Sequence, residues 1–560
     1  MDIIATIGPT LETYNNIKKA IQKGVNTFRL GLGYRSRDII SFIKIIRKVE
    51  KDINKKVFIM IDLPSSRPRI SNQVNINIKK DDIIYIVNKK TNEQFNINEI
   101  SINDFNDTLQ NIIQGSIITF LDGNLKFIVS EIQDNKIKLI CIDGQEILKE
   151  SNSLTVMDRK NPYRLIVDDD ITFFNKLNKE DLTIDWIAFS FAQTQSQILE
   201  AKKIIKNLHL IKTPKVIAKI ETKQALFQLN SMTSVVDGFM VARGDLAVNL
   251  DFKPLVAEAQ QQIVEICHKY NLYSIIATEL LENFVDNGTL SRSEISDLSL
   301  SISQMPSALQ LGKETVYSQR PFEAIDTLKE FIDYEIYRKE LYKYNLPVKK
   351  NRINKNLIVA IEGANGSGKS TLCRILSEHF NSKIRFGVLD LFLTKELKEK
   401  MIIDANWYSS SLFFISGAIE QIREFRKNGD KIIISDRSIW STLSVQTSQN
   451  PKRLKALIDV AYNIEGTEIE PDITIILRAD YETCKDRIKQ KSKDEQKLDS
   501  LVDSAKFYQK EDQFYNWLTF QRDNIISIDV NNISIENLSK YVIDLIEIKY
   551  KEMVDDKINN

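Results

Sequence analysis

Short apolar runs alternate with longer amphipathic segments over residues 1–330, and this rhythm constrains the fold more than any other feature of the chain. The apolar runs that read as buried strands are Ile3–Ile7, Thr27–Leu32, Val57–Leu63, Trp186–Phe191, Lys215–Ile220, Gly238–Ala242, Ser274–Ala277 and Ala308–Leu311. The intervening segments with helical spacing include Tyr14–Lys23, Ser36–Glu50, Ser196–Leu208 and Pro254–Tyr270. Strands linked by helical crossovers in this number predict an α/β fold, a closed parallel (β/α)8 barrel of the TIM type.

The rest of the sequence predicts further units. At residues 71–160 the runs become short, with turn pairs at Asp122-Gly123 and Asp143-Gly144, which predicts a small inserted β domain in a barrel formed by 1–70 and 161–332. Residues 333–355 predict a helix followed by a charged linker. A new strand–helix rhythm predicts a second α/β domain at 356–548 with a parallel sheet, and 549–560 reads as a polar tail.

Composition limits the partners and the compartment. Lys and Arg number 77 against 76 Asp and Glu, so no net charge draws the chain to nucleic acid or membranes. The four cysteines are scattered without a CxxC pair, which argues against disulfides or a zinc site. The sequence shows no secretory signal and no apolar run of about 18 residues, which favours a cytoplasmic protein acting on small molecules. A homo-oligomer stays open.

The segment between the strand Leu357–Ile361 and the helix after Ser370 has the pattern of a phosphate-binding loop. Its glycines let backbone N–H groups converge on phosphate oxygens, and the start of the helix adds its dipole. Lys369 would reach the terminal phosphates of ATP, and Ser370 would give an oxygen to Mg²⁺. The predicted ATP-binding residues are Gly363, Ala364, Asn365, Gly366, Ser367, Gly368, Lys369, Ser370, Thr371 and Arg487.

Two later segments of this domain carry further candidate residues. The strand Lys431–Ile434 leads to Asp436, which can hold the water shell of a metal, and to Arg437, which can pair with an acceptor phosphate. A later helix ends in a basic run made of Arg487, Lys489, Lys491 and Lys493. This run predicts either a solvated helix face or a lid that covers the transferred phosphoryl group.

Residues 356–548 resemble the thymidylate kinase and deoxynucleoside kinase group of P-loop kinases. The resemblance rests on Glu362-Gly363, Asp436-Arg437-Ser438, Ser441–Gln446 and Pro471-Asp472. It implies catalytic roles for Lys369 and Asp436 and a monophosphate held by Arg437. It also implies that Ser441 and Gln446 lie near the base. The helix at 409–424 lacks the arginine that the family aims at the nucleotide, so the substrate is a nucleoside or nucleotide of open base identity.

In the barrel, polar and charged residues gather at the ends of the predicted strands. They are Arg29, Asp62, Arg69, Lys219, Glu221, Arg243-Gly244-Asp245 and Thr278. Chemistry in such barrels takes place at that face. Glu221 and Asp245 can share one divalent ion, while Lys219 and Arg29 stabilise negative charge that develops on a substrate. The same charges can alternatively form buried salt bridges with an architectural role.

Residues 1–330 resemble pyruvate kinase. The matching segments are Ala5–Pro9, Phe28–Leu30, Ile61–Leu63, Ile217–Glu221, Met240–Leu246, Ala277-Thr278, Ser291–Asp297 and Glu314-Thr315. The insertion at 71–160 falls where that family has a mobile β-rich cap. The P-loop domain stands in place of the C-terminal regulatory domain of the family.

The resemblance implies a role for each barrel residue. Lys219 would stabilise the transferring phosphoryl group and the enolate, and Thr278 would lie near the proton relay. The residues that would hold Mg²⁺ or Mn²⁺ are Glu221, Asp245 and Asp62. The residues that would bind phosphoenolpyruvate are Arg29, at its phosphate, Arg69, and the backbone of Arg243, Gly244 and Asp245.

The sequence departs from the family on the side that handles K⁺ and ADP. Gly31, Gly33 and Tyr34 replace residues of a segment that helps to ligate K⁺, and Pro64-Ser65-Ser66 replaces a Lys-Gly-Pro motif. Arg67 stands where potassium-independent relatives carry a fixed lysine charge. This raises the hypothesis that Arg67 replaces K⁺.

Three functions are open on the sequence alone. The first is a two-activity phosphotransferase whose barrel converts phosphoenolpyruvate to pyruvate, or acts on a related enolpyruvate, while its C-terminal domain phosphorylates a nucleoside or nucleotide from ATP and releases ADP. The second is a single kinase whose barrel is a non-catalytic effector-binding or scaffolding module. The third is a barrel lyase or aldolase that acts on an oxo-acid.

Overall fold

The computed structural model describes most of the chain. The residues described are 1–33, 38–89, 93–157, 159–250, 254–277, 279–348, 356–382, 384–386, 400–401, 405–448, 450–490 and 504–559. The chain divides into two units, Met1–Ile332 and Asp333–Asn560.

The first unit contains a closed barrel of parallel strands in the spatial order β1-β16-β15-β14-β13-β12-β3-β2. The strands are β1 (Asp2–Thr6), β2 (Val25–Gly31), β3 (Phe58–Leu63), β12 (Trp186–Phe189), β13 (Lys215–Ile220), β14 (Gly238–Ala242), β15 (Tyr273–Ala277) and β16 (Ala308–Leu311). Every residue of β14 and β16 is buried, because the interior and the surrounding helices cover both faces of a barrel sheet. The predicted barrel is therefore confirmed.

Helices connect the barrel strands. They are α1 (Tyr14–Lys23), α2 (Ile39–Ile53), α4 (Asp168–Lys179), α5 (Gln195–Asn207), α6 (Lys223–Phe227), α7 (Leu229–Met232), α8 (Arg243–Asn249), α9 (Leu255–Tyr270), α10 (Glu282–Asn287), α11 (Arg292–Ser303), α12 (Lys313–Val316) and α13 (Pro321–Leu341). Helix α11 shows how the sequence sets a start point. The Ser291 hydroxyl accepts from the Glu294 N–H at 3.2 Å, and the Glu294 carboxylate accepts from the Ser291 N–H at 2.8 Å. This reciprocal pair satisfies two backbone donors that the helix leaves unpaired.

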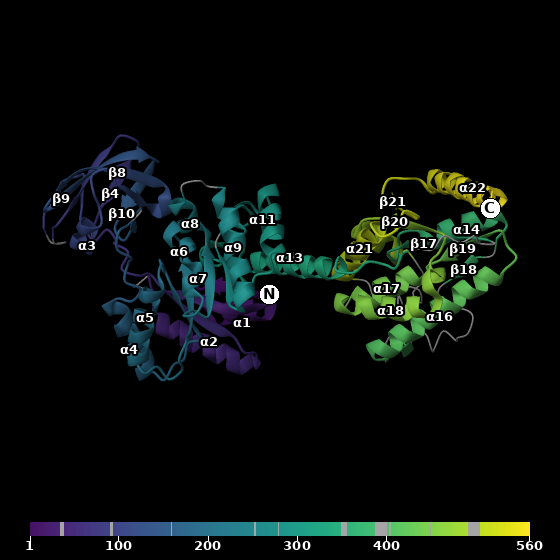
Figure 1. Ribbon diagram of the computed structural model, residues 1–560, viewed down its shortest axis with the longest axis horizontal. Helices are drawn as coiled ribbons and strands as arrows, with labels where there is room; N and C mark the ends of the chain where they lie inside the picture. The colour runs from purple at the N-terminus through teal and green to yellow at the C-terminus, as the bar shows by residue number, and fades with distance from the viewer. Residues whose placement is uncertain are drawn as a thin grey trace. The chain divides into compact units, whose positions relative to one another are not determined.

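The insertion after β3 forms a β-rich cap with its own apolar core (Figure 1). Its six-stranded sheet has the order β11-β7-β8-β9-β5-β6, and β10 pairs with β4 in a second sheet. The elements are β4 (Asn75–Ile78), β5 (Ile83–Val87), β6 (Glu99–Ile100), α3 (Phe105–Gln110), β7 (Ile117–Phe120), η1 (Leu121–Gly123), β8 (Leu125–Gln133), β9 (Lys136–Asp143), β10 (Glu146–Lys149) and β11 (Leu154–Val156). A β-bridge between Arg69 and Ser153 joins the two chain crossings at the base of the cap.

The second unit is a five-stranded parallel sheet of order β18-β19-β17-β20-β21, with an apolar core on each face. The strands are β17 (Leu357–Gly363), β18 (Ile384–Phe386), β19 (Ile432–Asp436), β20 (Ile473–Arg478) and β21 (Ile525–Asp529). The helices are α14 (Lys369–Phe380), α16 (Trp407–Lys427), α17 (Ile439–Ser448), η2 (Pro451–Arg453), α18 (Leu454–Glu465), η3 (Gly466–Ile469), α19 (Tyr481–Lys489), α21 (Ala505–Thr519) and α22 (Ile535–Asn559). This arrangement confirms the predicted P-loop α/β domain.

Two helices extend past the positions where the sequence suggested boundaries. Helix α13 runs through residue 333, where the sequence suggested that the barrel ends and a separate linker helix starts. Helix α22 continues to Asn559 through the segment expected to be a polar tail. Tyr550 and Met553 pack against the same core cluster as Val542, so the apolar stripe of the helix carries the helical structure past residue 548.

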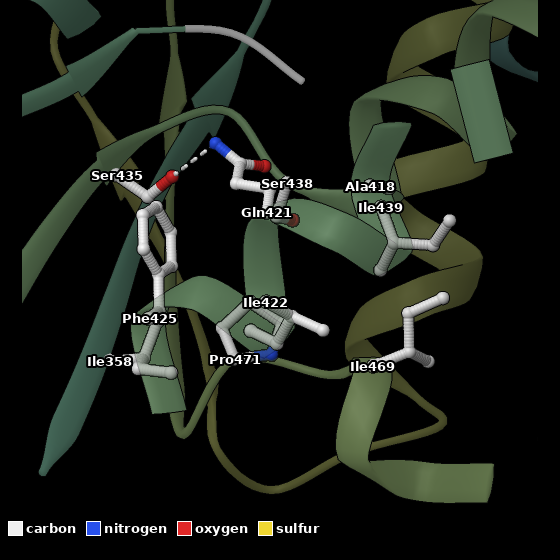
Figure 2. Close-up of a pocket in the computed structure, with 10 residues that line it drawn as sticks. All are labelled: Ile358, Ala418, Gln421, Ile422, Phe425, Ser435, Ser438, Ile439, Ile469 and Pro471. Atoms are coloured by element: carbon white, nitrogen blue, oxygen red, sulfur yellow. Dashed lines mark hydrogen bonds between the residues drawn. The ribbon is translucent and has the colours of Figure 1, made fainter. Parts of the chain in front are cut away.

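One cavity in the second unit lies between the sheet and helices α16 and α17 (Figure 2). Its lining is mostly apolar, and Gln421 Nε2 donates a hydrogen bond to Ser435 Oγ across it at 3.3 Å. The cavity measures about 10 Å³, which is the lower limit for a single water molecule. It is a packing gap behind the sheet and is too small for a substrate.

Candidate functional sites

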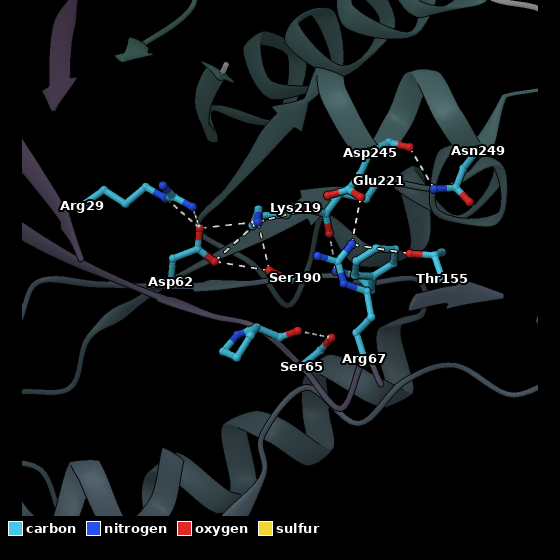
Figure 3. A network of polar contacts seen from close by, with 12 residues as sticks. Arg29, Asp62, Ser65, Arg67, Thr155, Ser190, Lys219, Glu221, Asp245 and Asn249 are labelled. Carbon is cyan, nitrogen blue, oxygen red and sulfur yellow. Dashed lines mark hydrogen bonds and ion pairs between the residues drawn. The ribbon is translucent and has the colours of Figure 1, made fainter. Parts of the chain in front are cut away.

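The carboxyl ends of the barrel strands bring the predicted charged residues to one face (Figure 3). Asp62 is the penultimate residue of β3, Lys219 is the penultimate residue of β13, and Glu221 follows β13 directly. Asp245 lies in the first turn of α8, just after β14. Because all strands of a parallel barrel end at the same face, these side chains converge there.

Lys219 is the centre of this polar network (Figure 3). Its ammonium group donates to Ser190 Oγ at 2.9 Å and to Asp62 Oδ1 at 3.4 Å, and it lies 3.0 Å from Glu221 Oε1. Burial alone would lower the pKa of Lys219, but the carboxylates of Asp62 and Glu221 outweigh burial and raise it. The site therefore keeps a charged ammonium group in a buried position.

Asp62 holds two cations in place. Arg29 Nε donates to Asp62 Oδ2 at 2.7 Å, and Arg29 NH1 donates to Thr6 Oγ1 at 3.2 Å. Burial favours a raised pKa for Asp62, but the Lys219 ammonium and the Arg29 guanidinium outweigh burial and lower it. Since both Asp62 oxygens face these cations, Asp62 positions Arg29 and Lys219. Glu221 and Asp245 are therefore the better candidates among the three predicted metal ligands.

Glu221 is a buried carboxylate with an unusual environment. Its Oε2 accepts a hydrogen bond from the backbone N–H of Phe191 at 2.5 Å. Phe191 has a φ of 56°, in the left-handed region that a bulky side chain rarely adopts. Burial raises the pKa of Glu221 to about 7. A cation bound next to this carboxylate would therefore lower its pKa and stabilise its ionised form.

Arg67 pairs with Asp245 at the same face (Figure 3). Arg67 NH1 donates to Asp245 Oδ1 at 2.9 Å, and the guanidinium lies 5.0 Å from the centroid of the Phe191 ring. The two charged side chains are 13% and 20% exposed. A fixed positive charge therefore stands beside a predicted metal ligand, directly after the Pro64-Ser65-Ser66 segment that departs from the family pattern.

Two arginines predicted to bind substrate have partners within the protein. Arg243 NH1 donates to both carboxylate oxygens of Asp297 at 2.7 Å. Arg69 NH1 donates to the backbone carbonyl of Ser151, at the base of the cap, at 3.0 Å. These contacts direct both side chains towards α11 and the cap. Gly244 lies in α8, and Thr278 lies outside the described residues.

The structure adds Ser190 and Phe191 to the barrel site. Ser190 contacts both Lys219 and Asp62, the latter at 3.2 Å, and the Phe191 backbone contacts Glu221. Both residues follow β12 directly, at the strand ends where polar site residues are expected in such a barrel. Ser190 was not predicted because it is uncharged and lies within the predicted apolar run Trp186–Phe191.

The phosphate-binding loop of the second unit connects β17 to α14. Lys369 Nζ donates to the backbone carbonyl of Ala364 at 2.8 Å, so the lysine folds back over the loop. Burial lowers the pKa of Lys369 to about 8, with a further contribution from the Arg437 guanidinium. Gly366 is required for the packing of this loop. Its φ is 82°, and a Cβ atom there would lie 2.3 Å from the carbonyl oxygen of Cys484.

Ser370 and Asp436 meet beside this loop. Ser370 Oγ donates to Asp436 Oδ2 at 2.6 Å, which joins the start of α14 to the end of β19. Hydroxyl and carboxylate oxygens are ligands that Mg²⁺ accepts in nucleotide sites. The predicted metal and catalytic positions of this domain are therefore adjacent in space.

Arg437 follows Asp436 in a left-handed backbone conformation, with a φ of 79°. Its NH1 donates to Ser441 Oγ at 3.1 Å, and its NH2 donates to Asn365 Oδ1 of the phosphate-binding loop. The guanidinium thus stands between the loop and α17, where an acceptor would approach. The contact between Asn365 and Arg437 links a predicted ATP-binding residue to a predicted acceptor-binding residue.

Glu362, at the end of β17, is fully buried and hydrogen-bonded. It accepts from Ser438 Oγ at 2.6 Å, from Tyr515 OH at 3.1 Å, and from Ser441 Oγ. Burial raises the pKa of Glu362, and the Ser438 and Ser441 hydroxyls partly oppose this shift. Ser441, predicted to lie near the base, is therefore tied into the network of Glu362 and Arg437.

The other predicted residues of this domain lie around the loop. Gln446 Oε1 accepts from Ser411 Oγ of α16 at 2.8 Å, and Thr371 is exposed on the first turn of α14. Arg487 NH1 lies 3.4 Å from the carbonyl oxygen of Ser367. Gly363 ends β17 and Gly368 precedes α14. In the basic run, Lys489 is an exposed partner of Asp486, and Lys491 and Lys493 lie outside the described residues.

Helix α21 contributes two residues that the sequence did not point to. Tyr515 contacts Glu362, as described above. Glu511 is buried, with 4% of the residue exposed, and its charge acts on Arg437 and Lys369. The sequence around it, Lys510-Glu511-Asp512, has the pattern of a solvated helix face, so only the tertiary structure reveals its position.

The two sites define a phosphotransferase in which a barrel with a buried lysine and carboxylates is joined to a P-loop kinase domain. Residues 1–325 match the family described as "Pyruvate kinase, barrel domain", and residues 361–542 match "Thymidylate kinase". The chain belongs to the pyruvate kinase barrel family and carries a thymidylate kinase domain. Both families are kinases, and they generally use ATP and Mg²⁺.

Known relatives support this assignment. The chain is 30% identical over 334 residues to "Pyruvate kinase" of Thermotoga maritima, which covers 59% of this chain and 69% of that protein. It is 29% identical over 337 residues to "Pyruvate kinase" of Thermoplasma acidophilum, with 59% and 57% covered. The solved structure of Cryptosporidium parvum pyruvate kinase in complex with ADP shares the fold at a TM-score of 0.53 and 23% identity, over 66% of this chain and 78% of that one.

No described helix is both long and apolar enough to span a membrane.

Proposed function

We propose that the chain is a bifunctional phosphotransferase. Its barrel acts on phosphoenolpyruvate or a related enolpyruvate with a divalent metal, and its C-terminal domain transfers a phosphoryl group from ATP to a nucleoside or nucleotide. The contacts of Lys219 with Asp62, Ser190 and Glu221 carry the barrel proposal. A lysine that stays charged in a buried site can stabilise both a transferring phosphoryl group and an enolate.

The donor set of the barrel fits Mg²⁺ or Mn²⁺. Among the described residues, no cluster of three or more His, Cys, Asp or Glu could hold a metal by itself. Kinase sites hold Mg²⁺ with one or two carboxylates together with substrate oxygens, so Glu221 and Asp245 suffice. When bound, the metal would neutralise charge on the oxygens of the substrate. Ser370 and Asp436 fit the same role at the P-loop site.

The remaining barrel residues would bind and orient the substrate. Arg29, held by Asp62, would contact the phosphate, and the backbone of 243–245 would contact the carboxylate. Arg69 would act at the base of the cap. That Thr278 lies near the proton relay stays a prediction. Arg67 would supply next to Asp245 the fixed positive charge that K⁺ gives in potassium-dependent relatives.

At the second site, Lys369 would bind the terminal phosphates of ATP together with the backbone of the loop. Arg437 would bind the acceptor, since it stands between Asn365 and Ser441. Transfer would proceed by positioning and charge neutralisation, with the acceptor oxygen in line with the leaving group. The fully buried Glu362 would keep Ser438 and Ser441 in place.

Two assays and two variants test this proposal. Pyruvate release from phosphoenolpyruvate is measured with a panel of nucleoside diphosphates, with and without K⁺, and ATP consumption is measured with nucleosides and nucleoside monophosphates. Lys219→Ala should abolish the first activity and spare the second, and Lys369→Ala should do the reverse. Loss of both activities in either variant would contradict independent sites.

One observation favours a second candidate function. Arg67 donates a hydrogen bond to one oxygen of Asp245, so this oxygen is already occupied by a partner within the protein. A permanent contact of this kind fits a non-catalytic, effector-binding or scaffolding barrel in which Asp245 binds no metal. In that case no combination of diphosphate and metal would release pyruvate, while the Lys369-dependent kinase would remain active.

A further inference from the structure

A buried tyrosine connects the base of the cap to the barrel site. Tyr163 lies in the chain crossing from β11 of the cap to α4 of the barrel, and it is 2% exposed. Its ring packs edge-on against the ring of Phe191, with 5.4 Å between the centroids and 77° between the planes. The backbone N–H of Phe191 donates to Glu221. Tyr163 is therefore one residue removed from a proposed metal ligand.

Phe191 has a backbone conformation that needs support from its surroundings. Its φ of 56° lies in the left-handed region, where a bulky residue persists only when its neighbours hold it. Gln197 Nε2 donates to the Phe191 carbonyl at 3.3 Å and also to the Tyr163 carbonyl, so one side chain ties both backbones together. The Tyr163 ring packs beside the Phe191 ring and restricts its rotation. The direction of the Phe191 N–H, which fixes the Glu221 carboxylate, therefore depends on Tyr163.

The cap contacts Tyr163 through two of its elements. The guanidinium of Arg159 lies 4.2 Å from the centroid of the Tyr163 ring, and Arg159 NH2 donates to Asp107 Oδ2 on α3 at 2.5 Å. The Tyr163 hydroxyl accepts from the backbone N–H of Val156, the last residue of β11, at 3.2 Å. Both α3 and β11 contribute side chains to the core of the cap. A shift of the cap relative to the barrel therefore changes the contacts of Tyr163.

We propose that Tyr163 is a positioning residue of the barrel site that holds Glu221 in place for the divalent metal through Phe191. In this arrangement, Arg159 makes the position of Tyr163 depend on the cap. The inference rests on the proposed metal site of the barrel. Tyr163 acts only through Phe191, and groups that orient a metal ligand in this way typically change metal affinity by about 10- to 100-fold when they are lost.

Binding of Mn²⁺ to the full-length protein tests this role without relying on activity. Free Mn²⁺ is measured by electron paramagnetic resonance with phosphoenolpyruvate present and nucleotide absent. All proteins carry Asp436→Asn, which removes a proposed metal position from the P-loop site, and the protein with this change alone is the reference. Tyr163→Leu should weaken Mn²⁺ binding about tenfold or more, because the ring that supports Phe191 is lost. Tyr163→Phe keeps the ring and should retain most of the affinity.

Tyr273→Leu is the matched control for the loss of the ring. Tyr273 is the first residue of β15, so it lies at the end of the barrel opposite to the site, and its ring packs against Trp186 with 5.0 Å between the centroids. This variant should unfold at a lower temperature than the reference but bind Mn²⁺ equally well. The two leucine variants remove the same atoms, so a loss of affinity confined to Tyr163→Leu separates positioning from general destabilisation.

A second pair of variants tests the dependence on the cap. Asp107→Asn weakens the partner of Arg159 and leaves the Tyr163 ring in place, so Mn²⁺ affinity should fall by a smaller factor than in Tyr163→Leu. Asp104→Asn is the control, because Asp104 directly precedes α3 and forms an exposed ion pair with Arg164 at 3.9 Å. It should bind Mn²⁺ as the reference does. The Asp107 side chain is 42% exposed, so Asp107→Asn should fold and decide the question if Tyr163→Leu does not fold.

The outcomes separate the inference from the function on which it rests. Equal Mn²⁺ affinities in the reference and in Tyr163→Leu overturn the positioning role and leave the metal site standing. Equal losses of affinity in Tyr163→Leu and Tyr273→Leu also overturn it, because affinity then follows stability. Unchanged binding in Asp107→Asn overturns the dependence on the cap. Mn²⁺ binding that is the same in Glu221→Gln and in the reference would overturn the proposed metal site itself and this inference with it.

Discussion

Arg67 NH1 donates a hydrogen bond to Asp245 Oδ1 at 2.9 Å and brings a fixed cation to the carboxylate that we propose as a metal ligand. The guanidinium is held from a second side by the ring of Phe191, whose backbone N–H binds Glu221. Phe191 thus contacts Glu221 directly through its backbone, and its ring packs against the arginine that pairs with Asp245. These two contacts, with Asp245 and with the Phe191 ring, hold the Arg67 side chain in place within the protein.

The first prediction concerns monovalent cations. Pyruvate release by the wild type should not change when K⁺ is replaced by tetramethylammonium, because Arg67 supplies the positive charge. Arg67→Gln should lower kcat/KM by about 10- to 100-fold, which corresponds to losing a charged hydrogen bond of about 1.5–3 kcal/mol. Arg67→Lys should retain most of the activity. Arg164→Gln, which changes an arginine with a 66% exposed side chain, is the control. Full activity of Arg67→Gln without K⁺ would contradict the role of Arg67.

The second prediction concerns the contact between the cap and the barrel. A Cβ atom on Gly123, in η1, would lie 2.4 Å from Val248 Cγ2, on the helix that carries Asp245. Gly123→Ala should therefore push the cap away from α8 and lower kcat/KM for phosphoenolpyruvate by about tenfold or more. Val248→Ala in the same chain should restore much of the activity, because it removes the atoms that clash.

Gly115→Ala is the matched control for this experiment. Gly115 has a φ of 92°, close to the 91° of Gly123, but a Cβ atom there would meet nothing within 4 Å. Both substitutions carry the backbone cost of a left-handed residue, about 1–2 kcal/mol, and only Gly123→Ala adds the clash. Equal effects of the two substitutions on activity would show that the contact with Val248 is unimportant.

The third prediction concerns thiol reactivity. All four cysteines are free and buried, and burial raises the pKa of Cys267 to about 12 and that of Cys484 to about 11. Because the thiolate is the reactive form, the native protein should not react with a disulfide reagent at pH 8. Four thiols should react after unfolding in guanidinium chloride. Rapid modification of one thiol in the native state would indicate a local opening near that residue.

Much of the fold could be predicted because the sequence pattern and the burial pattern coincide. The strands Lys215–Ile220 and Gly238–Ala242 have the predicted bounds, because each is mostly apolar and is followed directly by a charged residue. The same logic found Lys219, Glu221 and Asp245. Ser190 was missed because it is uncharged and follows an apolar run that the sequence extended to Phe191, whereas β12 ends at Phe189.

Glu511 shows the limit of sequence patterns more clearly. Its neighbours are charged, and a helix segment of this kind is usually a solvated face. Burial of Glu511 results from the packing of α21 against α17 and β17, which no local pattern encodes. The same holds for residues 333–346, part of the charged stretch 333–355 that predicted a helix followed by a linker, because Tyr337, Leu341 and Leu346 are part of a core.

The last prediction concerns that segment. Tyr337, Leu341 and Leu346 belong to the core cluster of the second unit and are 2%, 0% and 6% exposed. Side chains of helix α21, which lies after the P-loop in the sequence, also donate hydrogen bonds to the backbone of this segment. Gln513 donates to the Tyr334 carbonyl and Trp517 to the Tyr344 carbonyl, each at 3.1 Å. The segment is therefore an integral first element of the kinase domain.

A fragment of residues 350–560 should accordingly fail to fold, while a fragment of 333–560 should unfold cooperatively. Loss of three large buried side chains costs about 2–5 kcal/mol each, which together approaches or exceeds the total stability of about 5–15 kcal/mol typical of a domain. Circular dichroism during heating measures the transition of each fragment. In the longer fragment, Leu341→Ala should lower the midpoint, whereas Tyr342→Ala, at a position 46% exposed, should change it little. A 350–560 fragment that unfolds at the same temperature as 333–560 would show that the segment only tethers the domain.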